Sequence, residues 1–204
     1  MKNRFVRSVA ATAVVSLFGA GYSAGVVAEE SESIEFRLVH TAGVECLKKA
    51  RGYVRVRNRG PVEIMDMSVK GLPPNTEFDV FVIQTPEFPF GLSWYQGDLE
   101  TNAYGKGYAT FIGRFNEETF IVAPGETSAP FVHDEAFPDA TSNPATGPVH
   151  TFHIGIWFNS PDDAAAAGCP ARVTPFNGEH NAGIQILNTS NFPAEQGPLF
   201  ELKP

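Results

Sequence analysis

Residues 71–84, which read G-L-P-P-N-T-E-F-D-V-F-V-I-Q, predict a rigid corner followed by a core strand. Pro73 and Pro74 fix their own φ angles and have no N–H to donate to a strand ladder, so a strand can begin only after them. From Glu77 onward, apolar residues such as Phe78 and Val80 alternate with others, and this period of two is typical of a half-buried strand. We therefore expect a β-protein organised around this strand.

The corner resembles one that precedes a core strand in fibronectin type III and related immunoglobulin-like domains. Gly71, Leu72, Pro74, Thr76 and Phe78 match the pattern G-L-x-P-x-T-x-Y, except that a phenylalanine stands where that family has a tyrosine whose hydroxyl bonds to the backbone. The resemblance implies an all-β fold, namely a two-sheet antiparallel β-sandwich of immunoglobulin-like type. More than 100 of the 204 residues follow the corner, so the family's topology is not carried over, and the resemblance implies no function.

The N-terminus predicts a secretory signal peptide over residues 1–28. Basic residues at Lys2, Arg4 and Arg7 precede a short apolar stretch, and small residues lead up to a cleavage site after Ala28. The alternative is a retained anchor helix, but glycines interrupt the apolar stretch, which is also too short to span a bilayer. We expect residues 29–204 to form a single domain, extracellular or periplasmic, without a membrane span after cleavage.

Charge argues against nucleic acid as a partner. The formal net charge of −8 would become −11 if residues 1–28, with three basic groups and no acids, were removed. Such a surface repels phosphate backbones. Seventeen Phe, 19 Gly and 16 Pro indicate many short strands joined by turns.

Two cysteines, Cys46 and Cys169, predict a disulfide, because an even pair in an exported protein usually forms one. The chain-entropy argument gives such a long loop about 4–5 kcal/mol of stabilisation. Ser160 as N-cap and Pro161 at the first helical position predict one short helix near 161–167, which decorates the sandwich.

Strand patterns recur along the chain. Arginines alternate with Val54 and Val56 on one strand, and this outward row either protects an edge strand, the interpretation we favour, or meets an acidic partner. A slip near Ile64 indicates a β-bulge. The expected strands and hairpin cover residues 34–38, 51–57, 62–72, 98–115 (hairpin), 149–158 (central strand), 184–187 and 198–202.

The segment 85–95 places aromatic residues among prolines. Phe88, Phe90, Trp94 and Tyr95 either form a satellite hydrophobic cluster beneath the loop or an exposed platform for sugar rings or a protein partner.

Four histidines, namely His133, His150, His153 and His180, are either ordinary hydrogen-bonded or exposed side chains, which is the interpretation we favour, or ligands of a metal such as Zn or Cu together with nearby carboxylates. The acidic residues Asp134, Glu135 and Asp139 either form a solvated acidic loop, which we favour, or hold Ca, which prefers oxygen ligands. On a regular strand His150 and His153 point to opposite faces, so convergence would require a bulge or a strand end at His150. Residues 188–190 also form an N-glycosylation sequon at Asn188.

No nucleophile elbow, P-loop, dinucleotide fingerprint or H-E-x-x-H motif occurs. The leading hypothesis is therefore a non-enzymatic secreted protein without a cofactor. We expect it to mediate binding or assembly with an extracellular protein or glycan through the four aromatic residues and the loop 130–148. The alternative is a metal-binding sandwich or metalloenzyme that uses the histidines.

Overall fold

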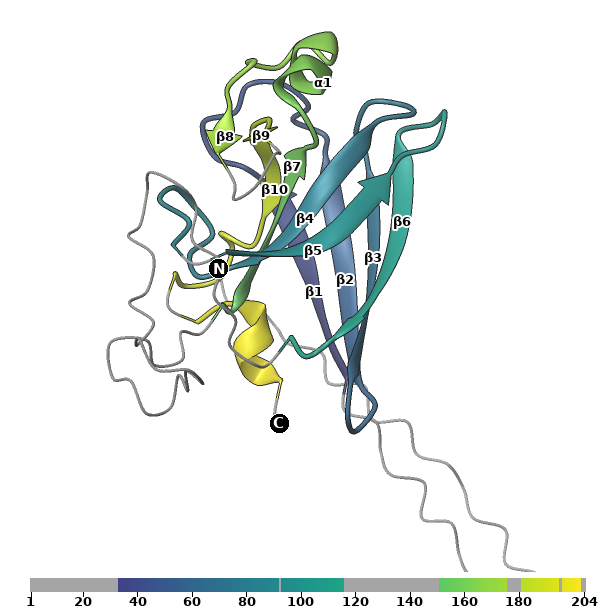
Figure 1. Cartoon of the computed structure of the whole chain (residues 1–204), viewed down its shortest axis with the longest axis vertical. Helices are drawn as coiled ribbons and strands as arrows, with labels where there is room; N and C mark the ends of the chain where they lie inside the picture. The colour runs from purple at the N-terminus through teal and green to yellow at the C-terminus, as the bar shows by residue number, and fades with distance from the viewer. Residues whose placement is uncertain (1–32, 92, 116–150, 176–180, 195, 203–204) are drawn as a thin grey trace, which may run out of the picture.

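The computed structural model describes residues 33–91, 93–115, 151–175, 181–194 and 196–202, which are coloured in Figure 1. In chain order the elements are β1 (Ser33–His40), β2 (Arg51–Asn58), β3 (Glu63–Lys70), β4 (Glu77–Ile83), β5 (Ser93–Glu100), β6 (Lys106–Gly113), β7 (His153–Phe158), α1 (Pro161–Ala166), β8 (Thr174–Pro175), β9 (Asn181–Ala182), β10 (Gln185–Asn188) and the 3-10 helix η1 (Pro198–Glu201). Antiparallel strands dominate, so the predicted all-β class is confirmed.

The corner before β4 is held by its backbone conformation and by one buried threonine. Gly71 (φ 78°) and Asn75 (φ 50°) take positive φ angles, which glycine adopts freely and asparagine tolerates. The Thr101 hydroxyl donates to the carbonyl of Pro73 at 2.6 Å and accepts the N–H of Thr76 at 3.0 Å. A threonine hydroxyl thus ties the corner to the backbone, in place of the tyrosine hydroxyl of the fibronectin-type pattern.

Strand β4 keeps the predicted alternation of side chains, but the prediction that it is half-buried is wrong, because both of its faces are buried. Phe78, Val80 and Val82 point into the main core, as expected. On the other face Phe81 and Ile83 belong to a second apolar cluster. The strand is therefore fully buried, because the loop that follows it folds back over its outer face.

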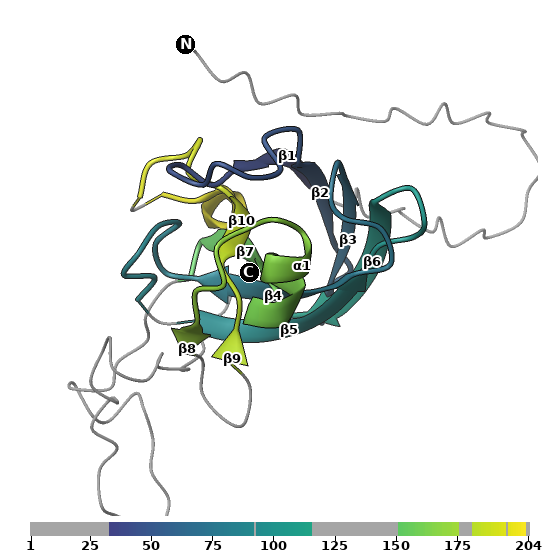
Figure 2. The ribbon, with the colours of Figure 1, turned by 90° about the horizontal axis from the view of Figure 1, so that it is seen from above.

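One near-closed sheet dominates the described part of the chain. Its eight strands run in the order β5-β4-β7-β10-β1-β2-β3-β6, with β8 and β9 as a separate pair. Seen from above, β1, β2 and β3 form one side and β4 and β5 the other (Figure 2). The end strands β5 and β6 approach at an isolated bridge between Thr101 and Gly107. The predicted division into two separate sheets is not confirmed, because hydrogen-bonded neighbours connect all eight strands.

The arginine-bearing strand β2 lies inside the sheet. It pairs with β1 on one side and along its full length with β3 on the other, so the edge-strand interpretation is wrong. Its arginines point outward from an interior strand, so protection of a sheet edge does not explain why they are there.

Strand β3 pairs without a break with β2 and β6, so the predicted bulge near Ile64 is also wrong. The pattern slips because Glu63 points inward, where its carboxylate accepts the backbone N–H of Phe115, while Ile64 points outward opposite Ile112. Register shifts instead lie between β4 and β5, where Val80 pairs with Gly97 and the next residue with Tyr95, and between β7 and β10, near Gln185.

Two further predictions from local patterns are wrong. The segment 98–115 does not form a paired hairpin, because β6 forms its ladder with β3, and among the described residues only an isolated bridge from Thr101, just after β5, to Gly107 joins its two arms. The last expected strand, 198–202, is the 3-10 helix η1.

The central strand, the helix and the disulfide are confirmed, although the strand begins at His153 and not at residue 149. Strand β7 lies between β4 and β10 with both faces buried. The Ser160 hydroxyl accepts the N–H of Asp163 and caps α1. Cys46 and Cys169 form a disulfide with Cα atoms 5.4 Å apart, which joins the β1–β2 connection to the segment after α1.

Candidate binding face

In the loop after β4, one of the aromatic residues predicted to bind a partner is buried and another is exposed. Phe90 is 7% exposed, and its ring centroid lies 4.9 Å from that of Trp157 in an edge-on contact. Phe88 is 67% exposed and packs edge-on against Phe90. Pro86 anchors the loop, since its carbonyl accepts buried side-chain amides from β10. Phe90 is thus part of the satellite cluster, whereas the ring of Phe88 is mostly exposed.

Trp94 and Tyr95 are both partly exposed, but they lie on opposite faces of β5. Trp94 pairs with Val82, which faces the main core, whereas Tyr95 pairs with Phe81 on the outer face. The Tyr95 hydroxyl donates to Asp98. The structure therefore does not bring the four aromatic side chains into one platform.

His153 is the one metal candidate within the described residues, and its ring nitrogens face protein partners. Nδ1 lies 2.8 Å from the hydroxyl of Thr189, and Nε2 lies 3.1 Å and 3.0 Å from the carbonyl oxygens of Pro193 and Ala194. Two carbonyls at Nε2 require an N–H there, so Nδ1 accepts from the threonine. Burial lowers the pKa of His153, which keeps the ring neutral.

The other candidate metal ligands, His133, His150 and His180, lie outside the described residues, as does the predicted contact loop 130–148. Among described residues, no group of three or more His, Cys, Asp or Glu side chains is arranged to hold a metal.

The sequon residue Asn188 is buried, and its amide donates to Pro86 and Gln185. Glycosylation at this position would disrupt those contacts.

A different surface stands out once the register is known, namely the outer face of β1, β2, β3 and β6. Residues directly opposite on an antiparallel ladder point to the same face, so the pairings define which side chains share it. We call it the Arg–Tyr face; it consists of Ser33, Glu35, Arg37, Arg51, Tyr53, Arg55, Arg57, Ile64, Asp66, Ser68, Lys70, Lys106, Tyr108, Thr110 and Ile112.

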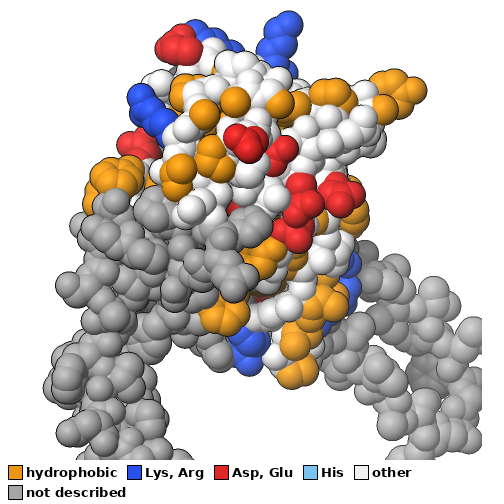
Figure 3. Space-filling model, turned by 45° about the horizontal axis from the view of Figure 1, so that its top comes forward, with side chains coloured by type: hydrophobic (Ala, Val, Ile, Leu, Met, Phe, Trp, Pro, Cys, Tyr) orange, Lys and Arg blue, Asp and Glu red, His pale blue; other side chains and the backbone are white. Residues whose placement is uncertain are grey.

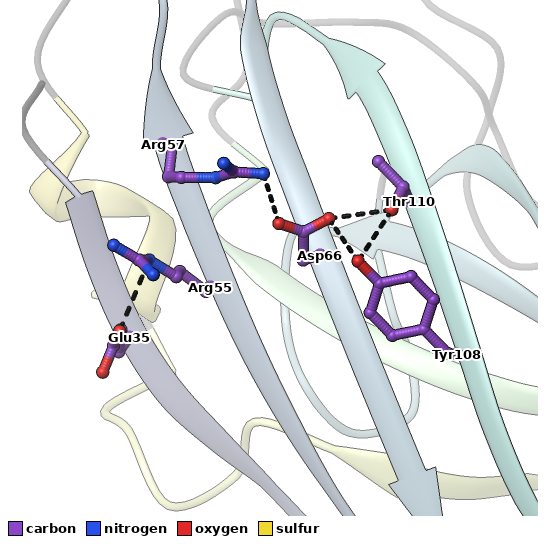
Figure 4. Close-up of polar contacts among 6 residues, drawn as sticks. All are labelled: Glu35, Arg55, Arg57, Asp66, Tyr108 and Thr110. Atoms are coloured by element: carbon purple, nitrogen blue, oxygen red, sulfur yellow. Dashed lines mark hydrogen bonds and ion pairs between the residues drawn. The ribbon is translucent and has the colours of Figure 1, made fainter.

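Asp66 is fully engaged at the centre of the Arg–Tyr face (Figure 4). One carboxylate oxygen accepts the Arg57 guanidinium at 2.5 Å, and the other accepts the hydroxyls of Tyr108 and Thr110, each at 2.8 Å. The hydrogen bonds from Thr110 and Tyr108, together with the charge of Arg57, hold the pKa of Asp66 below its usual value. The carboxylate therefore stays ionised, and its oxygens have partners already.

Glu35, the second acid of the face, is engaged in the same way. It lies 3.4 Å from Nε of Arg55 (Figure 4). Burial, with a hydrogen bond to Glu35, raises the pKa of Tyr53 to about 12. Both tyrosines of the face are thus tethered through their hydroxyls while their rings stay exposed, Tyr53 by 42% and Tyr108 by 66%.

The basic side chains outnumber these acids, with six cations against two carboxylates. Arg55 and Arg57 are paired with them. Arg51, Lys70 and Lys106 lie side by side on three neighbouring strands, and Arg37 lies opposite Tyr53. These last four are exposed, and within the described part of the chain none has an acidic partner.

The opposite side of the molecule carries the other sign. Glu77 pairs with Glu100, and Asp79 pairs with Asp98, on the outer face of β4 and β5. Acidic side chains gather on this side in the space-filling view (Figure 3). Burial, the hydrogen bond to Asp98 and the charges of Asp79 and Glu77 raise the pKa of Tyr95. The described part of the protein is therefore polarised, with a basic face on a chain that is acidic overall.

No protein-family model matches this sequence, and no curated protein is significantly similar to it. The resemblance of the corner to fibronectin type III domains stays a prediction. Among the described residues, no helix has the length and apolar character needed to cross a bilayer.

Proposed function

We propose that this is a secreted, non-catalytic protein that binds an anionic partner outside the cell through the Arg–Tyr face. The main support for this proposal is the excess of four positive charges on one exposed face of a chain whose formal net charge is −8. Removal of a signal peptide at residues 1–28 would leave this excess unchanged, because no residue of the face lies there.

The cationic row supports an anionic ligand on energetic grounds. Like charges directly opposite on neighbouring strands are destabilising, yet Arg51 faces Lys70 and Lys70 faces Lys106. An anion over this row would relieve that repulsion. In water, two unit charges about 4 Å apart attract by about 1 kcal/mol, so three such contacts supply about 3 kcal/mol, roughly a hundredfold in affinity.

The aromatic residues are less suited to be the main contact. Phe90 is buried, and Trp94 and Tyr95 point to opposite faces of their strand. The Arg–Tyr face instead offers both charge and exposed rings on one surface of four neighbouring strands, β1, β2, β3 and β6. The sheet already fixes the backbone of the binding groups, so a docking ligand has to order only their side chains.

We also propose that the near-closed sheet is a distorted two-layer sandwich of immunoglobulin-like type. Strand β1 pairs with β10 at two residues only, Val39 and His40, and with β2 at six. This weak junction supports a division into two four-stranded layers, β5-β4-β7-β10 and β1-β2-β3-β6, with the main core between them.

Binding to immobilised dextran sulfate, with neutral dextran as reference, tests the proposed function. We expect binding at about 0.1 M salt and loss at about 1 M, because the Debye length falls from about 10 Å to about 3 Å. Lys70→Gln should weaken binding about fivefold, since it removes one contact of about 1 kcal/mol.

The control is Arg172→Gln, which removes an exposed cation in the segment between α1 and β8. Unchanged binding by a triple Arg51→Gln, Lys70→Gln, Lys106→Gln variant would refute the proposal, as would an equal loss from Arg172→Gln.

A further inference from the structure

Two exposed tyrosines on the Arg–Tyr face flank a small residue. Tyr53, Ser68 and Tyr108 lie directly opposite one another on β2, β3 and β6, and all three are exposed. Because neighbouring strands lie about 4.8 Å apart, the two tyrosine-bearing strands are separated by about 10 Å, with only a serine side chain between them. The surface between the two rings is therefore open.

The tyrosine rings are held in place. The hydroxyl of Tyr108 is bound to Asp66 at 2.8 Å, and the hydroxyl of Tyr53 is bound to Glu35. Both carboxylates are themselves fixed by arginines. The rings thus offer apolar surface in a preorganised position, so a ligand that docks on them does not have to order them first.

Cations border this row of three residues on two sides. Arg37 lies at its end, opposite Tyr53. The row Arg51, Lys70 and Lys106 lies two residues further along the three strands, at a distance of about 7 Å. On the remaining side Glu35 and Asp66 are engaged. A ligand seated over Ser68 would therefore meet positive charge at its edges.

We propose that the anionic partner is an acidic polysaccharide, a glycan that carries carboxylate or sulfate groups. Its sugar rings lie against Tyr53 and Tyr108 above Ser68, and its anionic groups contact Arg37 and the row formed by Arg51, Lys70 and Lys106. This inference rests on the proposed function. It goes further because a polyanion without rings, such as poly-L-glutamate, could neutralise the cations but would not supply a ring with an apolar CH face to pack on the tyrosines.

The test compares two carboxylate polymers, polygalacturonate, which consists of sugar rings, and poly-L-glutamate, which has none. We expect Tyr108→Ala and Tyr53→Ala each to weaken binding to polygalacturonate about fivefold to tenfold, and to leave binding to poly-L-glutamate within about twofold. The matched control is Tyr104→Ala, because Tyr104 is 85% exposed on the turn after β5 and lies off the face.

Ser68→Leu provides a variant that adds bulk without removing a contact. It fills the space between the two rings at an exposed position where folding should be unaffected, so we expect weaker binding to polygalacturonate and unchanged binding to poly-L-glutamate. The same far-ultraviolet circular dichroism for every variant confirms folding.

The outcomes separate the two proposals. Equal weakening of both polymers by Tyr108→Ala, or no effect on either, overturns the glycan assignment while leaving the anionic partner in place. Failure of both polymers to bind the unmodified protein, or binding that Lys70→Gln does not change, overturns the proposed function itself.

Discussion

Thr101 should be one of the most sensitive polar positions in the fold, and Thr101→Val tests how the corner before β4 is held. Valine keeps the volume but removes a hydroxyl that donates to Pro73 at 2.6 Å and accepts the N–H of Thr76 at 3.0 Å. A net contribution of about 1 kcal/mol per hydrogen bond predicts that the free energy of unfolding falls by about 2 kcal/mol. The loss is larger if no water replaces the hydroxyl at the Pro73 carbonyl and the Thr76 N–H. For a domain of this size, the melting temperature should fall by about 4–8 °C.

Urea and thermal unfolding followed by circular dichroism measure this effect. Thr76→Val is the matched control, since it removes a hydroxyl whose bond to Pro74 is exposed, and it should cost less than about 0.5 kcal/mol. Thr101→Ser keeps the hydroxyl and should retain most of the stability. If Thr101→Val were no more destabilising than Thr76→Val, the hydroxyl would not be what fixes the corner.

Two further predictions concern buried groups. The pKa of His153 is lowered from 6.5, so as the pH falls the unfolded chain binds a proton at this histidine before the folded protein does. The free energy of unfolding should therefore decrease below about pH 6.5, by up to about 1.4 kcal/mol per pH unit. Urea unfolding at several pH values should show a smaller dependence of this free energy on pH for His153→Gln. Gly105→Ala should be far more destabilising than Gly43→Ala: both glycines have positive φ, but an added Cβ would clash with the Leu72 carbonyl oxygen at Gly105 and would meet no atom within 4 Å at Gly43. Equal melting temperatures of the two variants would contradict this close contact.

Features set by local chemistry could be read from the sequence. The prolines before β4, the alternation from Phe78 onward and the Ser160 cap each act within a few residues, and each prediction is confirmed. The Cys46–Cys169 disulfide was also predictable, although it is not local, because the chain has only two cysteines to pair.

Features that depend on distant pairing could not be read. A turn between β5 and β6 suggested that they pair with each other, but the ladder of β6 is with β3, whose sequence lies more than 30 residues away. That pairing places Lys106 beside Lys70 and Tyr108 beside Ser68. From the sequence, only the alternating arginines of β2 could therefore be predicted, and the rest of the Arg–Tyr face could not.

The sequence also could not predict which individual aromatic residues are buried. Phe88 and Phe90 occupy similar local sequences, yet one is exposed and the other packs on Trp157. The difference arises because the loop folds onto β7, which follows it by more than 60 residues. The local sequence pattern therefore could not decide between a buried hydrophobic cluster and an exposed aromatic platform.

The most direct measurement is an NMR titration of isotope-labelled protein with short galacturonate oligomers. We expect the backbone amide shifts to concentrate on β2, β3 and β6 around Tyr53, Ser68 and Tyr108, and to diminish at high salt. Shifts confined to the loop after β4 or to the acidic side of β4 and β5, with no shifts on the Arg–Tyr face, would contradict this binding site.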